Sequence, residues 1–126
     1  MNPDSNTMKI MTYNILLGGE NRLDHVINTI CAEKPDVLCV QEANEFEKEN
    51  DEKLKTVSEA AGLPYTALAL GTKRGSGKQF HVATLSQYPI LHRSSLHGFH
   101  HACLHTILDT ELGKLSFTNV HLCPNN

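Results

Sequence analysis

The sequence predicts an α/β fold in which a mixed sheet is flanked by two helices. Two short apolar runs, Met8–Asn14 and Lys34–Glu42, are separated by a segment with the periodicity of an amphipathic helix. A second helix-like segment follows, and the rest of the chain consists of short strand-like runs joined by turns. A helix between two strands is the usual connection of a parallel pair, so the sequence favours an amino-terminal β-α-β unit.

Each element of the β-α-β unit has its own signal in the sequence. A strand is predicted over residues 8–15, and the next helix is expected to begin at Asn21 as its N-cap and to end before Pro35. The run 36–40 is too short for a helix and apolar on both faces, which is typical of a central parallel strand. One face of the helix carries its apolar residues at the expected spacing: Leu23, Val26, Ile27, Ile30 and Cys31.

The remaining elements are marked by charge and by turn residues. We interpret the charged stretch 45–55 as the solvated face of a second helix within residues 43–62, for which Gly62 is a stop signal. The glycine-rich segment 71–79 is predicted to be a loop, because its spacing does not match a phosphate-binding P-loop. A tight hairpin is expected at Leu112-Gly113. Strands are predicted over 65–70, 81–87, 90–99, 102–109 and 114–122.

Composition indicates a single globular domain. The chain has 126 residues, of which 40% are hydrophobic and 20% charged. Its net charge is −3, and the sequence has no block rich in lysine or arginine. Strong non-specific binding to nucleic acid and a membrane span are therefore not expected. We expect residues 1–7 to be a flexible tail and 8–126 to form the domain. Four scattered cysteines and the lack of a signal peptide favour a reducing, cytoplasmic location.

Three predicted strands end in polar residues: Asn14, Glu42 and His121. The strand ends of a β-α-β unit lie at the same edge of the sheet, where α/β folds usually bind ligands. We therefore expect the three side chains to meet in one site. Strand alternation predicts that each shares an inward face with earlier residues of its strand: Ile10 and Thr12 with Asn14, Leu38 and Val40 with Glu42, and Leu115, Phe117 and Asn119 with His121.

Each of these residues has a chemical and a structural interpretation. Glu42 suits Mg²⁺, which prefers oxygen ligands and is often held by one or two carboxylates, but a strand-end glutamate also simply faces solvent. The Asn14 amide can donate to a phosphate oxygen or form a turn. His121 can stabilise negative charge on a phosphate or cap a strand. Asn119 either orients the His121 ring or is a packed polar residue.

Four short motifs carry a family resemblance. They are Thr12-Tyr13-Asn14, Gln41-Glu42, Ser86-x-x-Pro89-Ile90 and Asn119-x-His121-Leu122. In this order the chain resembles the endonuclease/exonuclease/phosphatase superfamily, with its DNase I-like fold, from Met8 to Pro124. The resemblance implies half of a four-layer α/β sandwich, in which a second sheet packs on the inner face. The downstream Gly-Asp-x-Asn and Ser-Asp-His motifs of this family are absent, so the chain is similar to an amino-terminal half truncated at its carboxyl-terminal half.

The resemblance implies a divalent-metal-dependent phosphoesterase acting on phosphodiesters or phosphomonoesters. Glu42 would hold Mg²⁺, with Mn²⁺ as an alternative, and Asn14 and His121 would be the catalytic groups at the phosphate. The implied substrate is a nucleic acid, a lipid headgroup or a small phosphorylated molecule. Because the missing motifs supply the general base in such enzymes, we expect this chain alone to be inactive.

Two alternatives remain. The chain could be a non-catalytic binding or half-domain module that assembles with a missing carboxyl-terminal half, or self-associates through an exposed inner sheet face. Zinc binding by His97, His100, His101, Cys103 and His105 is a minor alternative. Side chains two residues apart on a strand are about 7 Å apart, which is too far to close a tetrahedral site unaided.

Overall fold

The computed structural model describes residues 7–73, 75–96 and 101–122. Of the predicted tail, only Thr7 lies within these ranges. The elements in chain order are β1 (Ile10–Asn14), the 3-10 segment η1 (Leu17–Arg22), α1 (Leu23–Glu33), β2 (Val37–Gln41), α2 (Lys48–Ala61), β3 (Tyr65–Ala69), β4 (Val82–Ser86), β5 (Ile90–Ser95), β6 (Cys103–Thr110) and β7 (Gly113–Val120).

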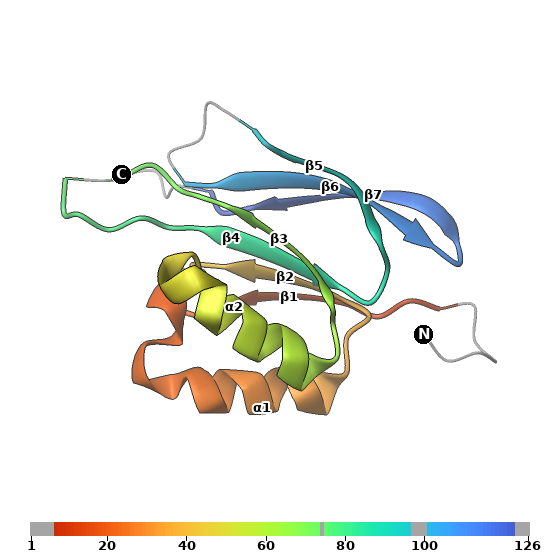
Figure 1. The fold of residues 1–126 in the computed structure, drawn as a ribbon, viewed down its shortest axis with the longest axis horizontal. Coiled ribbons are helices and arrows are strands. Elements are labelled where there is room, and N and C mark those ends of the chain that lie inside the picture. The colour runs from red at the N-terminus through yellow and green to blue at the C-terminus, as the bar shows by residue number, and fades with distance from the viewer. Residues whose placement is uncertain (1–6, 74, 97–100, 123–126) are drawn as a thin grey trace.

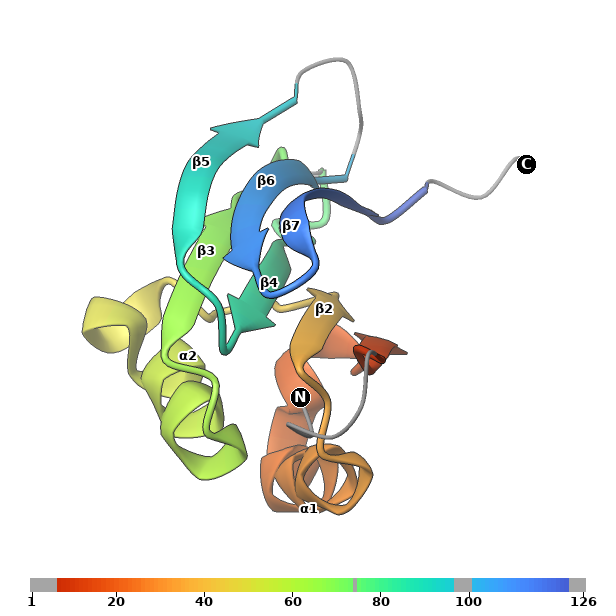
Figure 2. The same ribbon diagram turned by 90° about the vertical axis from the view of Figure 1, so that its right-hand side faces the viewer.

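The elements stack in three layers (Figure 1). A four-stranded sheet in the order β1-β2-β4-β3 lies in the middle, with the two helices on one face. A three-stranded antiparallel sheet, β5-β6-β7, covers the opposite face, as the rotated view in Figure 2 shows. The strands β1 and β2 are parallel, and β4 is antiparallel to both of its neighbours. The α/β fold, the β-α-β unit and the second sheet on the inner face are thus confirmed.

The observed ends of the helices agree only in part with those predicted from the sequence. Gly62 adopts a left-handed φ of 68° and ends α2, as predicted. Asn21 is not the N-cap of α1. Arg22 holds that position without a side-chain capping bond, because η1 occupies the residues before it. Among the described residues, no helix is both long enough and apolar enough to cross a bilayer.

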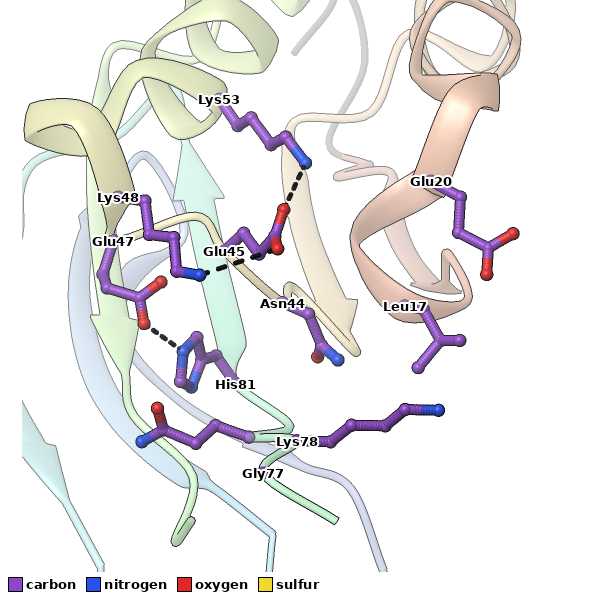
Figure 3. Close-up of a pocket in the computed structure, with 11 residues that line it drawn as sticks. Leu17, Glu20, Asn44, Glu45, Glu47, Lys48, Lys53, Gly77, Lys78 and His81 are labelled. Atoms are coloured by element: carbon purple, nitrogen blue, oxygen red, sulfur yellow. Dashed lines mark hydrogen bonds and ion pairs between the residues drawn. The ribbon is translucent and has the colours of Figure 1, made fainter. Parts of the chain in front are cut away.

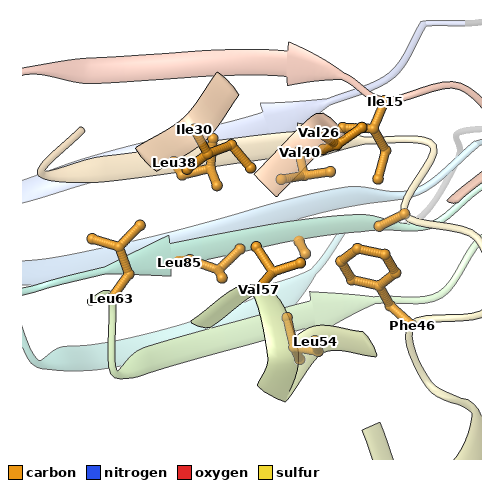
Figure 4. Packing of buried hydrophobic residues seen from close by; sticks show 12 residues of the cluster. Ile15, Val26, Ile30, Leu38, Val40, Phe46, Leu54, Val57, Leu63 and Leu85 are labelled. Carbon is orange, nitrogen blue, oxygen red and sulfur yellow. The ribbon is translucent and has the colours of Figure 1, made fainter. Parts of the chain in front are cut away.

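The main core lies between the helices and the four-stranded sheet (Figure 4). Phe46 and Val57 approach from the α2 side and Val26 and Ile30 from α1, and all four are almost fully buried. Their partners on the sheet include Leu38, Val40 and Leu85. Burial of this apolar surface is the dominant favourable term that holds both helices on the sheet.

The predicted inward face of β2 is wrong. Leu38 and Val40 pack against the helices, whereas Val37 packs with Tyr88 and Leu108 between the two sheets. The β1–β2 register pairs Thr12 with Cys39, which assigns the odd-numbered residues of β2 to the inner face. Every position from 37 to 40 is apolar and buried, so the sequence pattern alone did not distinguish the two faces.

Two buried thiols generate a prediction about chemical reactivity. Burial raises the pKa of both Cys39 and Cys103, so each stays protonated to a higher pH than an ordinary thiol. Because the thiolate is the nucleophile, we expect iodoacetamide at pH 8 to label the partly exposed Cys31 much faster than either. Peptide mass spectrometry resolves the sites, and labelling in urea is the control. Equal rates for Cys31 and Cys39 in the folded chain would contradict the prediction.

Candidate functional site

The structure brings the three predicted side chains together at one end of the sandwich. The Asn14 Nδ2 atom donates a hydrogen bond of 2.9 Å to Oε2 of Glu42. The Nε2 atom of His121 lies 3.6 Å from the same oxygen, and the Glu42 and His121 side chains are only 13% and 16% exposed. The predicted convergence is therefore correct, and it joins residues from β1 and from the ends of β2 and β7.

Glu42 reaches Asn14 by a backbone turn and not by the predicted strand alternation. It directly follows β2 and has a φ of 54°, in the left-handed region. This conformation costs a non-glycine residue on the order of 1–3 kcal/mol and is commonest at functional sites. Alternation along β2 would direct Glu42 toward the helices with Val40. The turn instead carries the carboxylate to the sheet edge.

The turn between β1 and α1 also holds Glu42, through hydrogen bonds to its carboxylate and to its carbonyl oxygen. Four successive residues, Leu16 to Gly19, have φ values of 58°, 52°, 73° and 81°. The Leu17 N–H donates to Glu42 Oε1 at 3.1 Å, and the Gly18 N–H donates to the Glu42 carbonyl at 2.7 Å. This turn was not predicted from the sequence, although the Gly18-Gly19 pair is a signal for positive φ.

Gly18 is required here by space as well as by φ. A Cβ atom at this position would lie 2.3 Å from the carbonyl oxygen of Asn44, a separation that real Cβ atoms do not show. The close approach brings the β1–α1 turn against the segment that follows Glu42. The two backbone segments that flank the carboxylate are therefore in direct contact.

Asn119 is a packed polar residue that links the two sheets. It is 2% exposed, and its Nδ2 atom donates to the carbonyl oxygens of Ala83 at 2.9 Å and Val40 at 3.3 Å. Its Oδ1 atom accepts from Nε2 of Gln41 at 2.9 Å. Of the two alternatives left open by the sequence, the structure supports packing between sheets. Asn119 positions His121 through the β7 backbone.

The His121 ring packs against two other aromatic rings. Its centroid lies 4.2 Å from that of His101, with an angle of 32° between the ring planes, and Phe80 meets it edge-on at 5.9 Å. Its Nδ1 atom is buried and has no hydrogen-bond partner among the described residues. The ring therefore presents Nε2 to Glu42 and to any ligand beside it.

The histidine-rich segment does not form a metal cluster in the described part of the chain. His97 and His100 lie outside the described residues. His101 packs on His121, whereas the Nε2 atom of His105 lies 2.6 Å from Oγ of Ser116. Within residues 7–73, 75–96 and 101–122, no group of three or more His, Cys, Asp or Glu side chains could hold a metal ion.

A pocket of about 470 Å³ is lined by Leu17, whose N–H holds the Glu42 carboxylate, and by Asn44, which follows Glu42 by two residues. Figure 3 shows both among the lining residues. Its walls come from η1, from the segment between β2 and α2, from α2 itself and from the loop before β4. The predicted glycine-rich loop thus forms one wall. The lining residues are Leu17, Glu20, Asn44, Glu45, Glu47, Lys48, Lys53, Gly77, Lys78, Gln79 and His81.

A buried histidine holds two of these walls together. His81 is 1% exposed, and its Nδ1 atom accepts a hydrogen bond of 2.9 Å from the Gly71 N–H. The proton of the neutral ring is therefore on Nε2, which donates to Oε2 of Glu47. This contact between residues distant in sequence ties the loop to the start of α2, and no local motif predicts it.

Comparison with known proteins identifies one family. The model of the Endonuclease/Exonuclease/phosphatase family matches residues 11–124. By sequence, no curated protein matches the chain. Among solved structures, an endonuclease/exonuclease/phosphatase family protein from Leptotrichia buccalis is 16% identical with a TM-score of 0.70, and the match covers 93% of this chain and 55% of that one.

Two further structures share the fold. Truncated TDP2 from Caenorhabditis elegans is 15% identical with a TM-score of 0.66, over 94% of this chain and 47% of that one. ANGEL2, described as a 2',3'-cyclic phosphatase, is 15% identical with a TM-score of 0.52, over 80% of this chain and 36% of its own. The chain thus spans between about a third and just over half of the length of these structures. At these identities the likeness concerns the fold.

The Asn119 contacts predict a large effect of one isosteric substitution. Asn119→Asp would direct a buried carboxylate at the Ala83 and Val40 carbonyl oxygens in place of a donor. We expect the free energy of unfolding to fall by about 3 kcal/mol or more at pH 7. Urea denaturation followed by circular dichroism measures it. The exposed Asn28→Asp on α1 is the matched control, and a similar small loss in both variants would refute the linking role.

Proposed function

The chain belongs to the endonuclease/exonuclease/phosphatase family, and from this premise we propose that it is part of a divalent-metal-dependent phosphoesterase. The reaction is the hydrolysis of a phosphodiester or a phosphomonoester. The observation that carries the proposal is the convergence of Asn14, Glu42 and His121 on one point at the end of the sandwich.

Glu42 is the proposed ligand of Mg²⁺, or of Mn²⁺ as the alternative. Its carboxylate is held by the Leu17 N–H and by the Asn14 amide, so its position is set before a metal binds. A single oriented carboxylate suits Mg²⁺, which keeps several waters and shares its remaining sites with substrate phosphate. When bound, such a metal polarises the phosphoryl group.

Asn14 and His121 are the proposed phosphate-orienting groups. The amide of Asn14 is exposed at the end of β1, and Nε2 of His121 faces the same region, so both can donate to non-bridging oxygens. Fixed donors of this kind stabilise the charge that grows on the phosphate in the transition state. The stacking of His121 on His101 supports a fixed ring orientation.

The substrate class remains a nucleic acid, a lipid headgroup or a small phosphorylated molecule. The fold neighbour described as a 2',3'-cyclic phosphatase supports a phosphate ester in general. The chain lacks the Gly-Asp-x-Asn and Ser-Asp-His motifs named above, so we propose that it binds metal and phosphate without turnover. Free thiols at Cys31, Cys39 and Cys103 support the proposed cytoplasmic location.

Metal binding by Glu42 is tested through thermal stability. At a Mg²⁺ concentration about ten times Kd, we expect the Tm to rise by about 3–8 °C, because the ion binds only the folded chain. Glu42→Gln should abolish the rise, and the exposed Glu52→Gln on α2 should retain it. The same preparations are assayed with p-nitrophenyl phosphate. A rise that persists in Glu42→Gln would refute the ligand assignment, and Mg²⁺-dependent turnover lost in Glu42→Ala would refute inactivity.

A second candidate is a module that assembles with a partner layer, and one observation favours it. β1 is an edge strand, and its inner face carries Ile10 at 53% exposure beside the exposed Thr12. The exposed apolar patch is smaller than the sequence predicts, because Leu38 and Val40 are buried under the helices. Within the described residues no strand pairs with the outer edge of β1, and such an edge with an exposed isoleucine favours addition of further strands, from a missing carboxyl-terminal half or from a second copy.

Association along β1 is tested by sedimentation velocity. We expect the chain to form dimers or larger species, and we expect Ile10→Lys to shift it toward monomer because a charge on the edge face resists pairing. Leu112→Lys, at the β6–β7 hairpin and 48% exposed, is the matched control and should not change the distribution. A wild-type chain that stays monomeric and melts cooperatively would eliminate the assembly candidate.

A further inference from the structure

We propose that the pocket beside Glu42 binds the hydroxyl-bearing part of the phosphate ester, a sugar or another polyol. The inference rests on the proposed function, because the phosphate itself would lie at Asn14 and His121. It adds a second subsite, which selects the group attached to the phosphate.

The pocket and the phosphate site share backbone. Leu17 lines the pocket, and its N–H holds the Glu42 carboxylate at 3.1 Å. Asn44, on another wall, follows Glu42 by two residues and contacts Gly18 of the same turn. The turn that holds the Glu42 carboxylate therefore also forms part of the pocket wall.

Asn44 supplies an unpartnered polar group. The residue is 8% exposed, and its Oδ1 atom is buried without a hydrogen-bond partner among the described residues. Figure 3 shows its amide directed into the pocket between Leu17 and Lys78. A buried amide without a partner destabilises the fold, and a ligand that pairs with it removes that cost.

Glu47 supplies a second unpartnered acceptor. Its Oε2 atom accepts from His81, but its Oε1 atom is buried with no hydrogen-bond partner in the described chain. His81 is neutral when its Nδ1 atom accepts from Gly71, so this contact satisfies one carboxylate oxygen without adding a positive charge. The Oε1 atom of Glu47 is therefore available to accept a hydrogen bond from a ligand.

The charges around the pocket favour a neutral ligand group. Three carboxylates, Glu20, Glu45 and Glu47, are balanced by the ammonium groups of Lys48, Lys53 and Lys78. Two of these lysines already pair with Glu45, at 3.6 Å and 3.2 Å. These six side chains carry no net charge, so the pocket does not favour an ionic ligand. What Asn44 and Glu47 lack is hydrogen-bond partners.

A hydroxyl group meets both requirements. It donates to the Glu47 carboxylate, and it pairs with the Asn44 amide in either orientation because it can donate and accept. An aryl or alkyl group would leave both side chains unpaired. The volume of about 470 Å³ lies in the range of small-molecule sites and accommodates a single sugar.

The test compares two phosphate monoesters of equal charge by isothermal titration with Mg²⁺ present. We expect ribose 5-phosphate to bind about tenfold more tightly than phenyl phosphate, as two net hydrogen bonds would give. Asn44→Leu, of similar volume, removes one of the two hydrogen bonds and should reduce this preference to about threefold. Asn28→Leu on the surface of α1 should keep the full preference.

Each outcome is decisive. Equal affinities in the wild type, or an undiminished preference of about tenfold in Asn44→Leu, overturn the polyol subsite, while Glu42-dependent phosphate binding leaves the proposed function standing. If neither ester binds, the proposed function and the subsite both fail. A melt of Asn44→Leu provides a second check. Its Tm should equal or exceed that of the wild type, and a lower Tm would show that the amide has a structural partner and would overturn the subsite.

Discussion

The amide of Asn119 is the contact on which the geometry of the site depends. It crosses the space between the sheets, donates to backbone of β2 and β4, and accepts from Gln41, the residue before Glu42. Two residues later the same strand delivers His121. One buried side chain thus sets the distance between the strand ends that carry the candidate ligands. A directional bond is needed here because apolar packing between sheets does not fix their relative register.

The carboxylate is held by backbone that ordinary residues disfavour. Leu16, Leu17 and Glu42 all have positive φ values, and only glycine adopts such values without steric cost. The compensation lies in the hydrogen bonds from Leu17 and Gly18 to Glu42. The backbone is locally strained at the turn, and this strained conformation orients the Glu42 carboxylate in the absence of a ligand.

Most of the fold followed from periodicity, because α1, β2 and the Gly62 stop each have a local signal. The meeting of Asn14, Glu42 and His121 followed from the topology of strand ends. The face on which Leu38 lies did not follow, since a strand buried on both sides is apolar at every position. The positive φ of Glu42 could not be predicted either, because neither a glutamate nor its neighbouring residues indicate a left-handed conformation. The contact between Glu47 and His81 spans 34 positions, and only tertiary structure brings the two together.

The close approach of Gly18 to Asn44 also bears on how this protein could be diversified. Any side chain at position 18 would displace the carbonyl of Asn44, and the damage would reach the carboxylate and the pocket wall at once. Gly75 is the opposite case, because a Cβ there would meet no atom of the described residues within 4 Å. Sequence libraries aimed at new ligand preferences should therefore keep glycine at position 18. They should randomise position 75 in the β3–β4 loop, where a side chain has space.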